Sequence, residues 1–524
     1  MTVSTAPPHA AALPAERVGA PPATEKHPGG LYVLFGTEMW ERFGFYTMLA
    51  MLTLYMRDAG EGFGWSTAHA TGVYSWYQAC VYASPLIGGW LADRFLGYRN
   101  AITVGGLFFL AGYLMLSVPK NVPVFFLSLA LLVIGNGFFK PNVSSMVGNL
   151  YKEGSHLKDR AYLIFYMGIN IGAFLAPICA EFVRGRFGFN RAFSVAGFGM
   201  LICLAIFWGF RRATAGANRP RAKEETPNAA SAAMEAIPEW KRIFALIVIF
   251  LIVIVFWMIF HQNGSTLTFW ANDNTNWNVT GIISNAINPF WIITLSLPLA
   301  WFWGFLDRRG LEPSTPTKIA IGMLLTGVSL LILYFAAISG GYTKPSARVV
   351  KAAGAPNSYY VALPDALRAN LGVQAPATKV DVPVRGNGGT RSVEVWAASA
   401  DVPLREGDLV GVSSPNGQLQ LEALRKVSPF WLILAYFVIS LGELMLSPMG
   451  LSLVSKVAPP RMRGLMMGGW FLATAIGNKL TAIGAFWDIW SHARFFLTLS
   501  MMALAMAVVL ILILRPLKKA MPGV

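Results

Sequence analysis

Charged residues are scarce in this 524-residue chain. They make up 13% of it, whereas hydrophobic residues reach 55% and the mean hydropathy is +0.51. Soluble globular proteins carry about 25% charged residues, so this balance excludes an ordinary soluble protein and is typical of many membrane spans. The net charge of +16 would suit a nucleic-acid partner. Most Lys and Arg, however, lie in short loops between apolar runs, where the positive-inside bias explains them, so no nucleic-acid partner is expected.

Cysteine is also rare, and several familiar signals are missing. The three cysteines all fall within apolar runs, so neither a disulfide framework nor a metal site is predicted, and no cofactor is expected. Residues 1–29 are rich in Ala and Pro and have no apolar segment of the signal-peptide kind, which predicts a disordered cytoplasmic tail. No nucleophile–base pair, phosphate-binding loop or metal-ligand spacing is present, and we therefore do not expect an enzyme.

Long apolar runs, by contrast, recur along the whole chain. Each is of about 20 residues or more, which is the length that crosses a bilayer as a helix. The runs occupy residues 30–57, 67–92, 99–118, 122–146, 161–183, 191–210, 241–270, 283–305, 317–338, 428–455, 464–487 and 492–514.

The basic residues between these runs predict the orientation of the helices. With the N-terminus inside, most loop Lys and Arg face the cytoplasm. The outer loops carry fewer, namely Arg57, Lys120 and Arg494, with one exception at Arg184 and Arg186. Twelve helices with both termini in the cytoplasm satisfy the positive-inside rule. The predicted cytoplasmic set is Arg94, Arg99, Lys152, Lys158, Arg160, Arg308, Arg309, Lys456, Arg461, Arg463, Arg515, Lys518 and Lys519.

Two polar interruptions divide the chain into predicted units. Residues 211–240 are charged and rich in Ala and Pro, which indicates a flexible cytoplasmic linker. Residues 340–427 show β-branched alternation broken by Gly, Pro and Asn, which predicts a small β-rich extracytoplasmic insertion between helices 9 and 10. The predicted units are 1–29, 30–210, 211–240, 241–339, 340–427, 428–514 and 515–524.

The two halves also resemble each other. "GGWLADRFLGYR" ends helix 2, and "WFWGFLDRRG" ends helix 8 at the equivalent place. The predicted fold class is therefore an all-α polytopic membrane protein of the major facilitator type, with two six-helix halves around a central cavity. We expect a multi-pass protein of the cell membrane, which is the inner membrane if the source is Gram-negative.

Three charges lie inside the first apolar run. Glu38, Glu41 and Arg42 are spaced i, i+3 and i+4, which places them on one helix face. A charge at the centre of a bilayer costs about 2.5–3.5 kcal/mol on insertion scales, so this face is predicted to line a wet cavity where the charges pair. The alternative is a salt bridge that only fixes the helix in register.

Further polar residues lie inside later spans. Lys140 in helix 4 either faces the cavity or reaches back to the cytoplasmic surface. Asn170 in helix 5 either contacts a ligand or joins two helices. Glu443 lies in the middle of helix 10, and together with Arg42 and Lys140 it predicts a cavity suited to a zwitterion. Trp257 and Trp470 either wall that cavity or serve as packing and interfacial residues.

At these positions the sequence resembles the proton-dependent oligopeptide transporter family of the major facilitator superfamily. Glu38-x-x-Glu41-Arg42-Phe43 resembles the family's ExxERF signature, and "FFKPNVSS" resembles its helix 4 lysine motif. "FYMGINIGAFLAP" and "GELMLSPMGL" resemble its signatures on helices 5 and 10. The four segments span both halves of the chain but do not include residues 340–427.

The resemblance implies a role for each matching residue. Proton coupling would involve Glu38, Glu41, Arg42, Lys140 and Glu443, and the predicted coupling set also includes His261, which departs from the family pattern. Arg42 and Lys140 would face the peptide carboxylate, and Glu443 with Asn170 would receive its amino group. The implied substrate-binding set is Arg42, Tyr46, Lys140, Asn170, Trp257, Asn288, Glu443 and Trp470.

Two positions depart from the family pattern. Leu49 stands where the family usually has an arginine on helix 1, and His261 stands where it usually has an acid on helix 7. In the family these two residues are expected to form an ion pair at the outer gate. Losing both together leaves no unpaired buried charge, so we expect the gate to be rebuilt without the pair. His261 would either titrate and join in coupling or serve only as a hydrogen-bonding residue.

The leading functional hypothesis is a proton-coupled symporter that imports di- and tripeptides by alternating access. The alternative is a proton-coupled transporter of the same fold with a non-peptide or modified-peptide substrate. A binding or sensing protein is disfavoured, because an idle cavity gains nothing from several buried charges. The expected partners are small peptides, protons and the lipid bilayer, and no obligate protein partner is evident.

Overall fold

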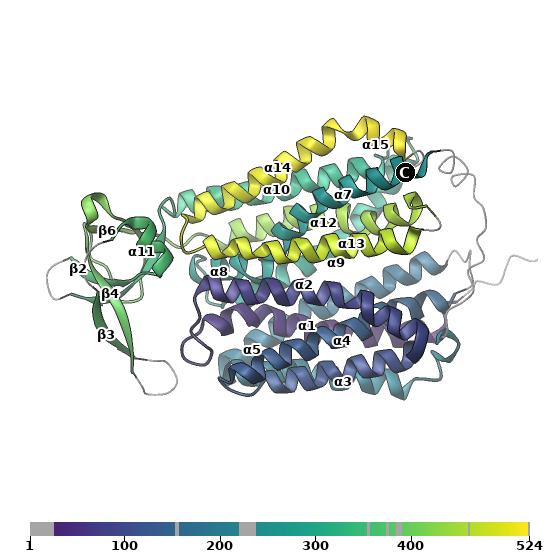
Figure 1. Ribbon diagram of the computed structural model, residues 1–524, viewed down its shortest axis with the longest axis horizontal. Helices are drawn as coiled ribbons and strands as arrows, with labels where there is room; N and C mark the ends of the chain where they lie inside the picture. The colour runs from purple at the N-terminus through teal and green to yellow at the C-terminus, as the bar shows by residue number, and fades with distance from the viewer. Residues whose placement is uncertain are drawn as a thin grey trace, which may run out of the picture.

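The computed structural model describes residues 26–151, 157–218, 237–353, 357–373, 377–383, 390–459 and 462–521. Figure 1 shows two groups of helices side by side, one from the N-terminal half and one from the C-terminal half, with a small sheet at one end. The predicted tail 1–29, linker 211–240 and tail 515–524 lie partly outside the described residues.

The N-terminal group contains long helices at every predicted position. α1 packs along α5, whereas α4 packs against both α2 and α3. α5 holds two predicted helices, because the chain turns at Gly188 with a φ of 83°. The helices are α1 Gly29–Arg57, α2 Thr67–Leu91, α3 Tyr98–Leu116, α4 Val122–Asn149 and α5 Leu157–Gly209. A π-helical turn η1 at Ala92–Leu96 and a 3-10 turn η2 at Ala215–Ala217 complete this group.

The C-terminal group is less regular than its hydropathy predicts. Its α-helices are α7 Glu239–Phe260, α8 Thr266–Asp273, α9 Ile287–Asp307, α10 Thr315–Ser339, α12 Pro429–Val457, α13 Arg463–Leu480, α14 His492–Leu512 and α15 Leu514–Ala520. Its 3-10 turns are η3 His261–Gly264, η4 Gly281–Ala286 and η7 Thr481–Phe486.

The membrane helix predicted over residues 241–270 is present within one span, Glu239–Asp273, but its backbone is not one continuous α-helix. The helix ends at Phe260, turns through η3, and resumes as α8 after Ser265, whose φ of −134° and ψ of −98° are not helical. The local sequence explains the break, because Asn, Gly and Ser are all weaker helix formers than the aliphatic residues around them. Two other predicted helices, 283–305 and 464–487, likewise include a 3-10 turn, at η4 and η7.

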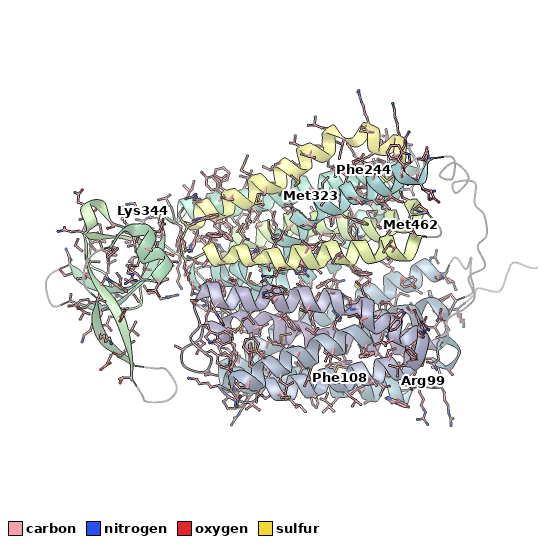
Figure 2. All side chains as sticks on the ribbon, in the orientation of Figure 1. Arg99, Phe108, Phe244, Met323, Lys344 and Met462 are labelled. Atoms are coloured by element: carbon pink, nitrogen blue, oxygen red, sulfur yellow. The ribbon has the colours of Figure 1, made fainter. Side chains whose placement is uncertain are left out.

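Membrane spanning follows from the length and apolarity of these helices. Eight helical segments of the described residues are long and apolar enough to cross a bilayer. α1, α2 and α13 are also long enough but are not among the eight, since their polar residues make them less apolar. Large apolar side chains such as Phe244 lie on the outside of the bundle (Figure 2), as contact with lipid requires. The chain is therefore a multi-pass membrane protein.

Close helix crossings explain several glycines. A Cβ atom on Gly88 of α2 would overlap the backbone carbonyl of Gly137 on α4, whereas a Cβ on Gly72 of α2 would meet open space. Small residues at such crossings let two membrane helices approach closely.

Gly88→Ala is therefore expected to destabilise the protein by about 1–3 kcal/mol, the usual cost of overpacking a well-packed contact. A lower melting temperature of the purified protein in detergent checks this. Gly72→Ala is the matched control and is expected to leave the melting temperature unchanged. Equal melting temperatures for the two variants would contradict the close packing of α2 on α4.

Residues 346–423 form a small sheet module. Its strands are β1 Ser346–Ala352, β2 Ser358–Ala362, β3 Thr378–Pro383, β4 Thr390–Ala400, β5 Leu409–Ser413 and β6 Leu419–Ala423, with a short helix α11 Asp365–Leu371. The strand order is β2-β1-β5-β6-β4-β3, and an additional β2–β4 pairing closes five of the strands into a ring. β4 and β6 are parallel, and the other pairs are antiparallel.

The module has its own hydrophobic core and a fixed attachment to the helices. Val361, Trp396 and Val410 belong to a buried cluster separate from the helical core. At its base, the backbone N–H of Val427 donates to the carbonyl of Asn274 at 2.9 Å, and that of Ala493 donates to Tyr342 at 3.1 Å. These bonds hold the module against the ends of α8 and α14.

Candidate functional site

The three charges of α1 form a buried ion cluster. The Arg42 guanidinium donates two hydrogen bonds to Glu41, from Nε to Oε2 at 2.5 Å and from Nη2 to Oε1 at 2.8 Å. Its Nε also lies 3.3 Å from Oε1 of Glu38. All three side chains are at most 4% exposed. In the described part of the chain, Glu38 Oε2 has no hydrogen-bond partner, so Glu38 is held less tightly than Glu41.

Asn136 connects this cluster to two neighbouring helices. Arg42 Nη2 donates to Asn136 Oδ1 of α4 at 3.4 Å, and Asn136 Nδ2 donates to the carbonyl of Val81 on α2 at 2.7 Å. Sequence reasoning did not select Asn136. Its position one helical turn before Lys140 was the available signal, since i and i+4 share a helix face.

Lys140 lies near the cluster but pairs with none of its carboxylates. Among the described residues it forms no ion pair, and its Nζ lies 4.8 Å from the centroid of the Tyr82 ring. Arg42 has a comparable neighbour, because its Cζ lies 4.9 Å from the centroid of the Phe45 ring. An aromatic ring thus lies against each of the two cations, the buried Arg42 and the half-buried Lys140.

A cavity of about 120 Å³, lined by both apolar and polar side chains, lies between the two groups of helices. Five of the predicted substrate residues line it, namely Tyr46, Asn170, Trp257, Asn288 and Glu443. Arg42 and Lys140 do not line it directly, although Phe45 and Tyr82 do. The other lining residues are Leu49, Tyr74, Gln78, Tyr166, Ile169, Ala173, Phe260, His261, Asn263, Gly264, Asn285 and Pro289.

The acid predicted in helix 10 is fixed by an amide from α9. Asn288 Nδ2 donates to Glu443 Oε2 at 2.9 Å and to Ser440 Oγ at 2.9 Å. This contact holds Glu443 at the cavity wall. Asn170 Nδ2 instead donates to the carbonyl of Tyr166 on its own helix at 2.9 Å.

His261 occupies the boundary between the two groups of helices. It is buried, its Nδ1 lies 3.5 Å from Gln78 Nε2, and the Tyr74 hydroxyl donates to its carbonyl at 3.2 Å. Its ring stacks on Trp257 with centroids 5.4 Å apart. Tyr74, Gln78 and Tyr82 are spaced by four on α2, a stripe that sequence reasoning missed although i, i+4 spacing marks one helix face.

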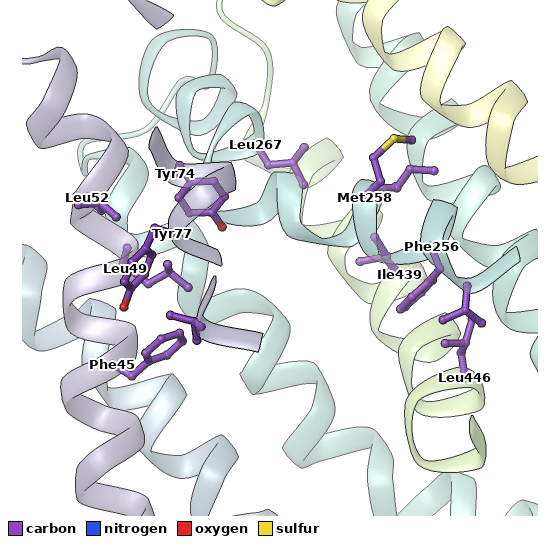
Figure 3. Packing of buried hydrophobic residues seen from close by; sticks show 14 of the residues in the cluster. Phe45, Leu49, Leu52, Tyr74, Tyr77, Phe256, Met258, Leu267, Ile439 and Leu446 are labelled. Atoms are coloured by element: carbon purple, nitrogen blue, oxygen red, sulfur yellow. The ribbon is translucent and has the colours of Figure 1, made fainter. Parts of the chain in front are cut away.

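Apolar packing surrounds the position of the missing gate arginine. Leu49 is buried and belongs to the same hydrophobic cluster as Phe45 and Tyr77 (Figure 3). Further along α1, Thr53 Oγ1 donates to the carbonyl of Gly264 at 2.9 Å. A Cβ on Gly264 would overlap the Tyr74 hydroxyl. Side-chain hydrogen bonds and close backbone packing therefore join the two halves near Leu49, where the family's expected ion pair is missing.

Trp470 lies elsewhere. It is not among the residues that line the cavity. Its ring packs over Gly450 of α12, and its centroid lies 6.1 Å from that of Phe250 on α7. Of the two readings of this tryptophan, the geometry favours packing within the C-terminal group.

Comparison with known protein families identifies the chain. A family model described as the POT family matches residues 99–215, 218–363 and 411–486, which is more than half of the chain. The chain belongs to the POT family. This confirms the resemblance found in the four sequence segments. The matched ranges omit residues 364–410, which lie in the sheet module of this POT-family chain.

Individual relatives are similar along almost the whole length. The "Uncharacterized transporter YclF" of Bacillus subtilis is 28% identical over 555 residues, which cover 95% of this chain and 96% of the relative. The "Di-/tripeptide transporter" of Lactococcus lactis is 26% identical over 565 residues, covering 95% and 97%. A crystal structure of a mutant of the peptide transporter POT in complex with alafosfalin matches with a TM-score of 0.71. Its sequence is 28% identical, and the match covers 96% of this chain and 97% of that one. The chain is thus a member of a family of membrane transporters that includes peptide transporters.

Proposed function

We propose that this POT-family chain imports di- and tripeptides together with protons by alternating access. The observation that carries the proposal is the buried Glu38–Glu41–Arg42 cluster, whose aromatic neighbour Phe45 lines the cavity between the two halves. Buried charges inside a membrane are costly and are retained where ions or substrates move. Protons are the proposed coupling ion, and no other cofactor is proposed.

The proposed topology has twelve spans in two six-helix halves, with both termini in the cytoplasm. The sheet module then lies on the extracytoplasmic side, at the end of the bundle where α1 and α8 end (Figure 1). The distribution of Lys and Arg between the loops supports this orientation.

In the proposed cycle, a proton first reaches Glu38, the carboxylate with an unpartnered oxygen. Neutralising Glu38 removes one of the two negative charges beside Arg42. The guanidinium then pairs with only one carboxylate, that of Glu41, and is freer to turn toward the cavity. The peptide carboxylate binds on the side of Arg42 and Lys140, and the peptide amino group binds at Glu443.

Phe45 and Tyr82 have a part in this mechanism. Each lines the cavity, and each lies against one cation, the buried Arg42 or the half-buried Lys140. The two rings thus lie beside the cations that are proposed to receive the peptide carboxylate. We therefore propose that ring rotation accompanies peptide binding.

Recognition of both peptide ends gives a direct test. The proposal predicts that dialanine competes with labelled dialanine in a counterflow assay, whereas N-acetyl-dialanine and dialanine amide compete at least about tenfold more weakly, because each has lost one charge-assisted contact. In Lys140→Ala, dialanine amide is expected to compete as well as dialanine. In Glu443→Gln, N-acetyl-dialanine is expected to compete as well as dialanine.

Exposed residues of the same charge provide the controls. Lys456→Ala and Asp307→Asn change residues that are exposed and distant from the cavity, so they are expected to leave both preferences intact. Equal competition by all three compounds in the wild type would contradict recognition of a zwitterionic peptide.

The alternative is a transporter of the same fold with a non-peptide or modified-peptide substrate. Leu49 and His261, the two departures from the family pattern, both line the cavity, and this observation favours a changed substrate. Failure of dialanine to compete, with proton-driven uptake of another solute, would select this alternative.

A further inference from the structure

A cleft separates the sheet module from the helices beneath it. Two cavities, of about 440 and 430 Å³, lie there and share five lining residues, Ser66, Leu363, Pro364, Glu394 and Asp488. We refer to the residues around both cavities as the module cleft. Its walls come from the module, from the ends of α1 and α8, and from the loop between η7 and α14.

One end of the module cleft has excess positive charge. Arg348 of β1 donates from Nη2 to Asp273 Oδ1 at 2.6 Å, and Arg57 Nη1 lies 3.8 Å from Asp273 Oδ2. Two guanidiniums therefore share a single carboxylate. The Arg348 side chain is 51% exposed and that of Arg57 is 26% exposed, so both remain accessible to a second anion.

Of the remaining acids of the module cleft, Asp365 lies 3.5 Å from Nη2 of Arg368, whereas two others have no such partner. Glu394 on β4 and Asp488 after η7 line both cavities. Neither forms an ion pair or accepts a side-chain hydrogen bond among the described residues. An interface that served only to dock the module would gain by pairing these carboxylates, whereas here they stay available.

The space between the charges is suited to a small, partly apolar ligand. Leu363, Leu409 and Trp487 line the larger cavity between the charged groups. Its volume falls within the range of about 300–1,000 Å³ that is usual for small-molecule sites.

We propose that the module cleft is a second, low-affinity binding site for di- and tripeptides. The peptide carboxylate contacts Arg57 and Arg348, and the peptide amino group contacts Glu394 and Asp488. This inference rests on the proposed function of the central cavity, because both sites take the same zwitterionic ligand. Arg57 ends α1, whose residues line the central cavity. A peptide held in the cleft is therefore concentrated next to the route into the bundle.

Photolabelling of the full-length protein in proteoliposomes tests the proposal. The probe is benzoylphenylalanyl-alanine, a photoreactive dipeptide with free ends, and adducts are mapped by mass spectrometry after proteolysis. Adducts are expected on peptides from residues 340–427 as well as on the helices. Excess dialanine is expected to remove both sets, and N-acetyl-dialanine amide, which has neither charged end, is expected to remove neither.

A double variant and a matched control separate binding from folding. Glu394→Gln with Asp488→Asn is expected to lower the module adduct by about threefold to tenfold, because exposed charge pairs each contribute little. The helix adduct is expected to remain, which shows that the variant is folded. Asp381→Asn with Asp401→Asn removes the same charge from exposed module residues that line neither cavity, and is expected to leave both adducts unchanged.

The outcomes distinguish this inference from the proposed function. Labelling confined to the helices, or absent from the module while the chain transports dialanine, would overturn the second site alone. A module adduct that is insensitive to the double variant would overturn it as well. Absence of both adducts together with absence of dialanine uptake would overturn the peptide transporter and its second site together.

Discussion

Glu38→Gln is expected to abolish uphill accumulation of dialanine while leaving exchange of peptide across the membrane. Glutamine resembles a permanently protonated glutamate, so the variant loses the proton-binding step but keeps a neutral side chain beside Arg42. Glu38 is the better candidate for that step, because its Oε2 is unpartnered whereas both oxygens of Glu41 contact Arg42. In proteoliposomes with an acidic exterior, the variant is expected to equilibrate dialanine at an inside-to-outside ratio of about 1, since a proton that cannot bind cannot contribute its free energy.

Counterflow of labelled dialanine into liposomes preloaded with dialanine shows that the variant remains functional. Asp307→Asn, which neutralises an exposed acid at the end of α9, is the control and is expected to accumulate dialanine like the wild type. Gradient-driven accumulation that survives in Glu38→Gln would remove this residue from the coupling step.

Arg42→Met is expected to cause the largest loss of stability. Arg42 is the only basic residue that forms an ion pair with either Glu38 or Glu41 among the described residues. Its removal leaves two buried carboxylates without an ion-pair partner. Breaking a buried ion pair from one side typically costs about 3–5 kcal/mol. We therefore expect a marked fall in melting temperature and in the yield of folded protein.

Neutralising the two acids at the same time provides the diagnostic control. The triple variant Glu38→Gln, Glu41→Gln, Arg42→Met contains no unpaired charge at this position and is expected to recover most of the lost melting temperature. A single Arg42→Met variant that melts like the wild type would show that the cluster is not electrostatically coupled, and would argue against its role in proton transfer.

The positions of the membrane helices could be predicted from the sequence because hydropathy reports burial in lipid. Each apolar run contains a helix in the structure. Hydropathy does not report backbone turns, however, so η3 at His261–Gly264 was missed. That turn depends on contacts with the other half of the molecule. They include the hydrogen bonds that the Thr53 and Tyr74 hydroxyls donate to the carbonyls of Gly264 and His261. Such contacts are distant in sequence and leave no local pattern.

The same distinction applies to the candidate site. The Glu38–Glu41–Arg42 cluster was predictable, because i, i+3 and i+4 spacing alone brings these side chains together. The link from Arg42 to Asn136 joins α1 to α4, and residues 94 positions apart give no such signal. For Trp470 the sequence left two alternatives open, a cavity wall or a packing residue, because the space over Gly450 where its ring packs leaves no local pattern.

The strand pairing of the sheet module could not be predicted from the sequence. Alternation of β-branched residues predicted strands, but the β2–β4 pairing that closes the ring and the parallel β4–β6 pairing depend on long-range register. The module cleft depends further on how the module sits on the helices. For that reason Arg57, Asp273 and Arg348, which lie on three separate elements, were not predicted to meet.

Uptake of labelled dialanine into proteoliposomes of the wild-type protein, driven by an inward proton gradient, tests the central claim most directly. With one proton per peptide and a gradient of one pH unit, the account predicts about tenfold accumulation, since a tenfold ratio corresponds to about 1.4 kcal/mol. A protonophore is expected to return the ratio to unity. Dialanine that enters but never exceeds its outside concentration, with the gradient verified by a pH-sensitive dye, would contradict proton-coupled peptide import by this chain.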